Sequence, residues 1–217
     1  SSWKSTTVEE SAWDSVECAD EVVTVSYDVT MDGKATIEFL DDGTQDYMAV
    51  MSSSDLYFNT QVSGGVRLDF YTSDNDAIAL APWGDDGAVL WTNSDTAWGY
   101  DLEFRTGWSL STCDWGSEHT ASANSGDAYT QSAWNTMEIT WDAAAEIALG
   151  KVTKSDGTSE SLELNLSELA ASGALSFGTA YQYSNTYFAN FKYYGESSSD
   201  DDDATSTTTV YKMTSGK

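Results

Sequence analysis

Apolar and polar residues alternate along several separate stretches of the chain, and this period of two limits the possible folds. From Val23 to Met31 the odd positions hold Val, Tyr or Met, and the positions between them are polar. Successive side chains of a β-strand point to opposite faces of a sheet, so this pattern predicts a strand with one buried and one solvated face. The pattern recurs at 66–70, 102–104, 137–141, 162–166 and 187–193.

Turn-forming pairs separate these stretches. They are Asp32-Gly33, Asp42-Gly43, Gly64-Gly65, Asp86-Gly87 and Asp156-Gly157. Many short strands joined by turns of this kind are typical of a sandwich or barrel. Only 142–149 and 167–171 are compatible with short helical turns. The sequence therefore predicts an all-β fold, an antiparallel two-sheet β-sandwich.

The chain is strongly acidic, with nine Lys and Arg against 36 Asp and Glu and a formal net charge of −27. Such a surface repels phosphate backbones and anionic headgroups, so we expect neither nucleic acid nor a membrane as a partner. No apolar run approaches the length of a membrane span. The first residues lack the basic start and apolar stretch of a signal peptide, and we interpret the sequence as a mature secreted chain whose leader was removed.

The two cysteines of the chain are Cys18 and Cys113. In a secreted chain an even number predicts a disulfide, and a single pairing is possible here. Closing so long a loop stabilises a fold by about 4 kcal/mol on the chain-entropy model. The alternative is a pair of unlinked buried thiols, because spacing in the sequence does not show proximity in space.

Composition changes abruptly after Gly195, where Ser and Asp residues form a charged stretch that cannot bury apolar surface. We divide the chain into an N-terminal segment (1–19), a sandwich domain (20–195), an acidic linker (196–204) and a C-terminal strand (205–217). A β-prone segment beyond such a linker is expected to pair with the sheet of another copy. The expected strand-exchange residues are Thr207, Thr209, Val210, Tyr211 and Met213.

Several short motifs resemble those of galectin-type sandwiches. The segment from Asn75-Asp76 to Leu80 resembles their strand signature, and Asn93 and Trp98 to Asp101 resemble their Asn and Trp-Gly-x-Glu positions. A closer resemblance is to the galectin-like domain named for farnesoic acid O-methyltransferase, whose order of motifs matches 75–80, 100–104, 134–141 and 146–151. The resemblance covers roughly residues 20–194 and implies a galectin/concanavalin-like jelly roll.

The residues with which galectins bind galactosides are mostly absent. Ala81 to Gly84 contains neither the His nor the Arg of that family, and Glu103 stands in place of a cation. A glycan-binding role carries over only to Asn93, Trp98 and Asp101. Because no Gly-rich loop opens a helix and no parallel βαβ pattern is present, methyltransferase activity with a nucleoside cofactor is not expected.

Catalytic residues are sparse. His119 is the single histidine and falls in the Ser/Gly/Ala-rich stretch 117–126, where we interpret it as an ordinary loop residue. A polysaccharide lyase needs a base and a cation on one face, yet the chain has only Arg67 and Arg105 as arginines. We therefore expect a protein that is not an enzyme. A carboxylate pair of a sandwich glycanase stays open as an alternative, since the chain is so acidic.

Calcium is the expected small ligand. Closely spaced oxygen donors that suit Ca²⁺ occur in two turns, and neither turn matches the twelve-residue helical calcium loop. The candidate ligands are Asp41, Asp42, Asp46, Asp74 and Asp76. The alternative is that both turns are simply solvated.

Tryptophans are the most conspicuous candidates for glycan binding, because aromatic rings stack on the apolar faces of sugars. Trp83 and Trp115 lie beside Gly and Asp in turn-like sequence, and we weigh surface exposure equally against burial for them. Trp134 and Trp141 alternate with polar strand residues and are assigned to the core. Asn165 is the acceptor of the sequence's N-glycosylation sequon, Asn-Leu-Ser.

Three functions follow from these observations. In the first, which we place slightly ahead, the chain is the subunit of an extracellular fibre that grows head-to-tail by strand addition. In the second, it is a glycan-binding module of a secreted protein. In the third, it is a sandwich-fold glycanase or polysaccharide lyase. The expected partners are other copies of the chain and glycans.

Overall fold

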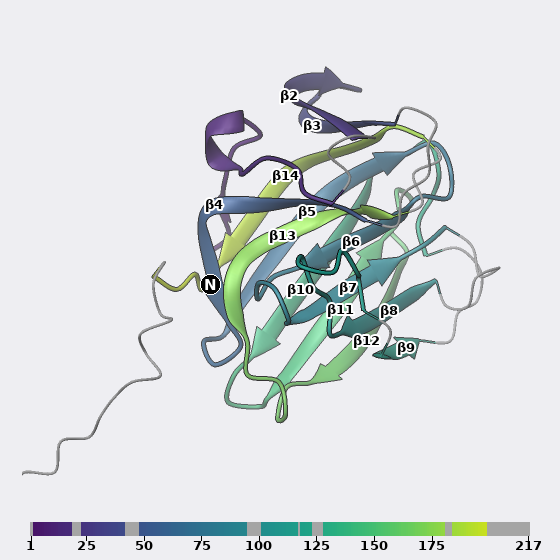
Figure 1. Cartoon of the computed structure of the whole chain (residues 1–217). Coiled ribbons are helices and arrows are strands. Elements are labelled where there is room, and N and C mark those ends of the chain that lie inside the picture. The colour runs from purple at the N-terminus through teal and green to yellow at the C-terminus, as the bar shows by residue number, and fades with distance from the viewer. Residues whose placement is uncertain are drawn as a thin grey trace, which may run out of the picture.

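A computed structural model describes residues 2–18, 23–41, 48–94, 101–116, 118–122, 128–180 and 184–198 of the chain. Two antiparallel sheets lie face to face in it (Figure 1). The eight-stranded sheet has the order β12 (Ser159–Asn165), β11 (Ile147–Thr153), β10 (Asn135–Asp142), β5 (Gly64–Thr72), β14 (Thr186–Tyr194), β3 (Lys34–Asp41) and β2 (Val23–Met31), and β1 (Lys4–Ser5) also pairs with β14. The six-stranded sheet has the order β4 (Ala49–Asn59), β13 (Ser172–Ala180), β6 (Ala77–Ala81), β7 (Ala88–Thr92), β8 (Leu102–Thr106) and β9 (Glu118–Ser122).

The predicted all-β sandwich is confirmed for these residues. Each alternating stretch coincides with a strand, and in the regular strands β5, β8, β10 and β12 its apolar positions line the space between the sheets. In β5, for example, Val66, Leu68 and Phe70 belong to the core, and Arg67 and Asp69 alternate with them. The predicted C-terminal strand, 205–217, lies outside the described residues.

Neither of the two stretches that are compatible with short helical turns forms a helix. Residues 143–146 form the turn of the hairpin between β10 and β11, where the Asp142 carboxylate accepts hydrogen bonds from the N–H groups of Ala144 and Ala145. Residues 167–171 contain a turn and no helix. The described residues do contain a short 3-10 helix at Glu10–Ala12, which the sequence did not predict.

A β-bulge in β2 breaks the alternation that the sequence predicts for 23–31. The pairing of β2 with β3 shifts between Ser26 and Val29, and Asp28 adopts a φ of 51° there. The extra residue turns the rest of the strand over. Val29 and Met31 therefore lie on the opposite face from Val25, not beside it.

A second bulge has the same effect in β14. Ala189 pairs with Asp69 and Lys192 with Arg67, so β14 holds one more residue than β5 between these pairs. Asn190, with a φ of 55°, accommodates it, in keeping with the tolerance of Asn for positive φ. As a result Phe188 and Phe191 both point into the core, although residues three positions apart in a regular strand point to opposite faces.

The interior between the sheets is rich in aromatic rings. Phe177 contacts Phe188 and Phe191 at centroid distances of 4.7 and 5.0 Å. Trp13, from the N-terminal segment, packs on the same group, 5.1 Å from Phe177. Residues of the segment 2–18 thus contribute to the core of the sandwich.

The outer face of the six-stranded sheet is covered by a segment that we name the Trp loop, residues 107–116. Trp108 and Trp115 of this loop are fully buried against Trp91 and the small residues of β6. Gly107 and Gly116 flank the loop at φ values of 74° and 90°, which other residues rarely adopt. The loop thereby turns back onto the sheet, and we call this side of the sandwich the covered face.

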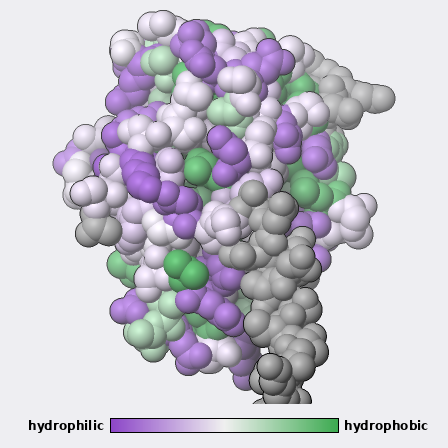
Figure 2. Space-filling model, turned by 90° about the vertical axis from the view of Figure 1, so that its left-hand side faces the viewer, coloured by the Kyte–Doolittle hydropathy of each residue, from purple (hydrophilic) through white to green (hydrophobic). Residues whose placement is uncertain are grey.

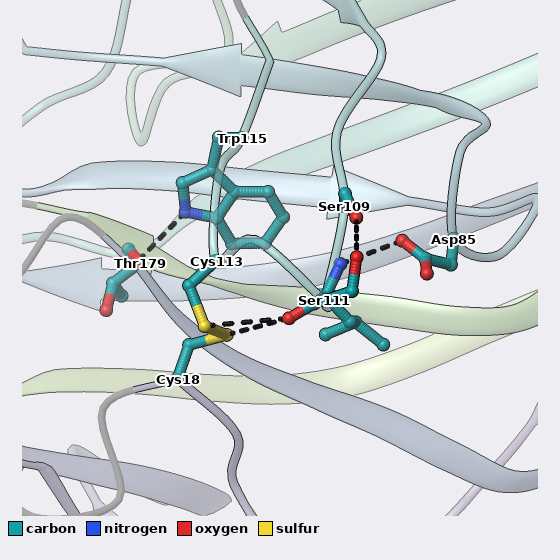
Figure 3. The surroundings of a disulfide bond; sticks show 8 residues. Cys18, Asp85, Ser109, Ser111, Cys113, Trp115 and Thr179 are labelled. Atoms are coloured by element: carbon teal, nitrogen blue, oxygen red, sulfur yellow. Dashed lines mark hydrogen bonds between the residues drawn. A yellow bond between two sulfur atoms is a disulfide. The ribbon is translucent and has the colours of Figure 1, made fainter.

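A disulfide ties the Trp loop to the N-terminal segment (Figure 3). Cys18 and Cys113 are bonded, with Cα atoms 5.5 Å apart, as the even cysteine count predicts. The indole N–H of Trp115 donates to the carbonyl of Thr179 at 3.3 Å, and the N–H of Leu110 donates to Asp85 at 2.8 Å. The covered face is therefore closed by both covalent and polar contacts.

None of the described helices is long and apolar enough to cross a membrane.

Candidate functional site

The outer face of the eight-stranded sheet is built differently, and we name it the open face. Residues that alternate with the core residues of β5, β10 and β14 project from it. Among them Tyr71, Tyr187 and Trp134 are only half-buried, although large aromatic side chains are usually hidden in a core. Rings held at the surface of a rigid sheet can contact a ligand.

These three rings form a row across neighbouring strands. Tyr187 stands directly opposite Tyr71 in the register, and Trp134 immediately precedes Asn135, which pairs with Phe70. The ring centroid of Tyr71 is 5.7 Å from that of Trp134 and 6.1 Å from that of Tyr187. We name this group the aromatic row.

Polar contacts hold the aromatic row in place. Burial and then a hydrogen bond with Glu38 raise the pKa of Tyr187 above its ordinary value. The Lys34 ammonium lies 5.4 Å from the ring centroid of Trp134, within cation–π range, and pairs with Asp69 at 3.3 Å. The indole N–H of Trp134 has no hydrogen-bond partner among the described residues.

A second row, four residues further along β5, is charged. Arg67 stands opposite Lys192 on one side and opposite Glu138 on the other, and Glu138 in turn stands opposite Lys151. Glu138 is 3.8 Å from both Arg67 and Lys151. Lys192 donates to the hydroxyl of Ser5 at 3.0 Å. We name these residues the cationic row, and it lies about 14 Å from the aromatic row.

A pair of rings closes the far end of the open face. Trp3 and Tyr194 meet edge-to-face at 4.8 Å, and the Arg67 guanidinium lies 4.6 Å from the centroid of Trp3. Gly65 underlies both rings, which come so near that a Cβ there would overlap them. A shallow hollow of about 380 Å³ adjoins Tyr194 and includes Leu149, which is 39% exposed.

The open face thus offers aromatic rings at both ends, with hydrogen-bonding and charged groups between them. Four of the nine basic residues of the chain project from it, namely Lys34, Arg67, Lys151 and Lys192. Aromatic rings set among charged groups suit a polar ligand with flat apolar faces better than an apolar partner. On the side of the molecule drawn in Figure 2, apolar residues likewise form small separate patches among hydrophilic ones.

The structure decides between exposure and burial for the aromatic candidates. Trp83 and Trp115 have no exposed surface, Trp83 because it packs on Trp141 at 5.2 Å and Trp115 because it lies in the Trp loop. They cannot meet a glycan directly. Trp134, assigned to the core, is half-buried on the open face, while the burial of Trp141 is confirmed.

The remaining glycan candidates do not form a surface site. Asn93 is 8% exposed and Asp101 is 0% exposed, and the Asn93 N–H donates to the Asp101 carbonyl at 3.1 Å. Trp98 lies outside the described residues. Burial and then the adjacent Glu160 carboxyl group raise the pKa of Asp101 to about 7. Asp101 immediately precedes β8 and is buried, whereas Glu160 lies in β12 and is half-buried.

The calcium candidates also separate. Asp74 is exposed, but Asp76 is fully buried and accepts hydrogen bonds from the hydroxyls of Thr72 and Thr186 at 3.2 and 2.8 Å. Asp76 thus links strands of both sheets and does not lie in a solvated turn. Asp41 ends β3, while Asp42 and Asp46 lie outside the described residues. Among the described side chains no group of three or more His, Cys, Asp or Glu could hold a metal ion.

The glycosylation candidate, the single histidine and the strand-exchange residues differ in what the structure shows of them. Asn165 is exposed at the end of β12, and its side chain accepts the N–H of Ser167 at 2.9 Å. His119 belongs to strand β9, opposite Arg105, and not to a loop. The strand-exchange residues, Thr207 to Met213, lie outside the described residues, so strand addition stays a prediction.

Comparison with known proteins gives a fold and no family. No protein-family model matches the chain, and no curated protein matches it. Peanut lectin with a 9mer peptide is similar in structure, with a TM-score of 0.55, 10% identity and coverage of 89% of this chain and 97% of the lectin. The lectin from Bauhinia forficata in complex with GalNAc has a TM-score of 0.51, 14% identity and coverage of 92% and 100%.

Lectin II from Ulex europaeus has a TM-score of 0.52, 9% identity and coverage of 88% and 97%. At these identities the likeness shows the fold alone. The chain therefore has a lectin-like β-sandwich, which agrees with the jelly roll implied by the galectin resemblance. The particular resemblance to the farnesoic acid O-methyltransferase domain gains no support from these structures.

Proposed function

We propose that the protein binds carbohydrate on the open face. The aromatic row carries the proposal. Its rings offer apolar faces to sugar rings, and Glu38, Asp69 and Lys34 beside it offer partners for sugar hydroxyls. The similarity in fold to lectins, one of them in complex with GalNAc, supports the same class of ligand.

We also propose that this binding is not coupled to catalysis and takes place outside the cell. The disulfide fits an oxidising compartment. The adjacent carboxyl groups of Asp101 and Glu160 do not suit a glycanase, because Asp101 is fully buried. Bound Ca²⁺, a glycan on Asn165 and assembly into fibres stay predictions beside this function.

Substitution on the open face tests the proposal. Trp134→Ala and Tyr71→Ala are compared with the parent protein by affinity electrophoresis against a panel of neutral and acidic polysaccharides. For any polysaccharide that retards the parent protein, we expect each variant to bind about fivefold more weakly, because a stacked ring contributes about 1 kcal/mol. Circular dichroism shows whether the variants keep the fold.

Tyr57→Ala is the matched control. Tyr57 is also half-buried, but it lies on β4 of the six-stranded sheet, where it alternates with the core residue Phe58. We expect its affinity to equal that of the parent protein. Retardation that is unaffected by Trp134→Ala and Tyr71→Ala, or that falls equally in Tyr57→Ala, contradicts a site on the open face.

A further inference from the structure

The cationic row points to the chemical class of the ligand. We propose that the glycan carries isolated acidic groups, carboxylate or sulfate, and that one of them lies between Arg67 and Lys192. This inference rests on the proposed function and specifies it. The aromatic row holds the sugar rings, and the cationic row selects their charge.

The register of β14 and β5 places two cationic side chains next to each other. Arg67 and Lys192 are direct cross-strand neighbours on one face. Like charges in such positions destabilise a sheet, and the chain has 36 acidic residues from which a compensating neighbour could come. Glu138 is the one acidic residue that we place in the cationic row. Its carboxylate lies 3.8 Å from Arg67 and 3.8 Å from Lys151, so the two cations share it. An anion between Arg67 and Lys192 would relieve their repulsion.

The donors are also arranged for an anion. The ring of Trp3, 4.6 Å from the Arg67 guanidinium, restrains that group on the face, and the Arg67 side chain keeps 33% of its surface exposed. A guanidinium presents paired N–H donors that match the two oxygens of a carboxylate or sulfate. Lys192, held by the Ser5 hydroxyl at 3.0 Å, supplies further N–H donors at the neighbouring position.

The charge of the rest of the chain limits how many acidic groups the ligand carries. A net charge of −27 repels a polyanion at long range. A single anion at the cationic row is attracted at contact distance, because salt screens charges beyond about 8 Å at physiological ionic strength. A mainly neutral glycan with sparse acidic groups therefore fits this surface better than a heavily charged one.

Paired polysaccharides test the inference. Glucuronoxylan, partly methyl-esterified pectin and a sparsely sulfated galactan are each compared with the same polymer after carboxyl reduction or desulfation. We expect at least one acidic form to bind about tenfold more tightly than its neutral counterpart. We expect Lys192→Gln and Arg67→Gln to remove this preference while binding to the neutral form is unchanged. The carboxylate and sulfate polymers distinguish the two sources of the anion.

Lys154→Gln is the control, because it removes one charge from the turn after β11, away from the cationic row. An equal loss in Lys154→Gln, equal affinity for every acidic and neutral pair, or equal weakening of both forms by Lys192→Gln overturns the inference. If neutral polymers bind through Trp134 without any acidic preference, the inference falls and the proposed function stands. If no polymer binds, both fall. A change in oligomeric mass in Lys192→Gln, with glycan binding unaltered, assigns the row to contact with a second copy and also overturns it.

Discussion

The two outer faces of the sandwich differ in what covers their aromatic residues. On the covered face Trp91 lies beneath the Trp loop, with the Arg105 guanidinium 3.8 Å from its ring centroid, and the Cys18–Cys113 disulfide fixes the loop. On the open face Tyr71 and Trp134 keep part of their rings in solvent. The chain therefore uses Trp in two ways, as core material on one face and as accessible surface on the other. Variants that separate these two roles test the comparison.

The largest effect is expected from the disulfide. Cys18→Ser combined with Cys113→Ser frees the Trp loop from the N-terminal segment, across a sequence separation of 95. We expect the free energy of unfolding in urea to fall by about 4 kcal/mol. Because the disulfide lies on the covered face, glycan binding on the open face should persist where the variant is folded. Loss of binding in a fully folded variant would show that the faces are coupled.

Next comes Trp115→Ala, which empties the space beneath the Trp loop. Trp115 is fully buried and contacts Trp108 at 5.5 Å, so we expect a loss of about 3 kcal/mol in urea unfolding. Trp134→Ala is the matched substitution on the open face and should cost only about 1 kcal/mol, since part of this side chain is already in solvent. Equal losses for the two variants would refute the distinction between the faces.

A pH-dependent effect is expected at Asp101, where the six-stranded sheet meets β12. Its pKa rises from 3.8 to about 7 on folding, mainly through burial and then through Glu160, with Lys154 acting in the opposite sense. Folding therefore takes up a proton, and stability falls as the pH rises from the lower value to the higher one. Urea titrations between about pH 4 and about pH 8 give the free energy of unfolding as a function of pH. In Asp101→Asn the decrease with pH that this carboxyl group causes should vanish. The exposed Asp74→Asn is the control, and an unchanged slope in Asp101→Asn would contradict the prediction.

The smallest effect should be a stabilisation, whereas the disulfide and tryptophan substitutions destabilise the protein. Lys192→Gln removes the like charge opposite Arg67 on the open face, so we expect the free energy of unfolding to rise by about 0.5 kcal/mol. Lys151→Gln provides the comparison, since it removes a favourable contact with Glu138. Thermal unfolding at low salt measures both, because salt screens such contacts. A destabilised Lys192→Gln would mean that the row is a structural ion network.

Much of the fold could be predicted from the sequence because hydrophobic periodicity is a local signal. The strands containing Leu68, Phe104 and Ile139 followed from alternation alone. The failures have local causes as well. Asp28 and Asn190 each add one residue to a strand, and nothing in an apolar pattern marks a bulge before its partner strand is known. Asp142 to Leu149 was ambiguous because a hairpin turn and a helical turn share their first hydrogen bonds.

The site was harder to predict because exposure depends on tertiary packing. Trp115 lies in turn-like sequence and Trp134 at an alternating strand position, yet Trp115 is buried in its own loop and Trp134 is partly exposed. The open face did leave a usable signal. Arg67 and Asp69 stand at the outward positions of a predicted strand, and Tyr187 begins another, but their assembly into rows required the strand order β10–β5–β14, which no local pattern contains.

The bulge at Asn190 can be removed without exchanging the two faces of the sheet. If Asn190 were deleted, Phe191 would follow Ala189 directly and stand opposite the core residue Leu68, while Lys192 and Tyr194 would keep their places opposite Arg67 and Gly65. The strand would lose only the local bend and added twist that a bulge gives it. Homologous chains with or without this residue could therefore present the same side chains on the open face, at a different angle between its two rows.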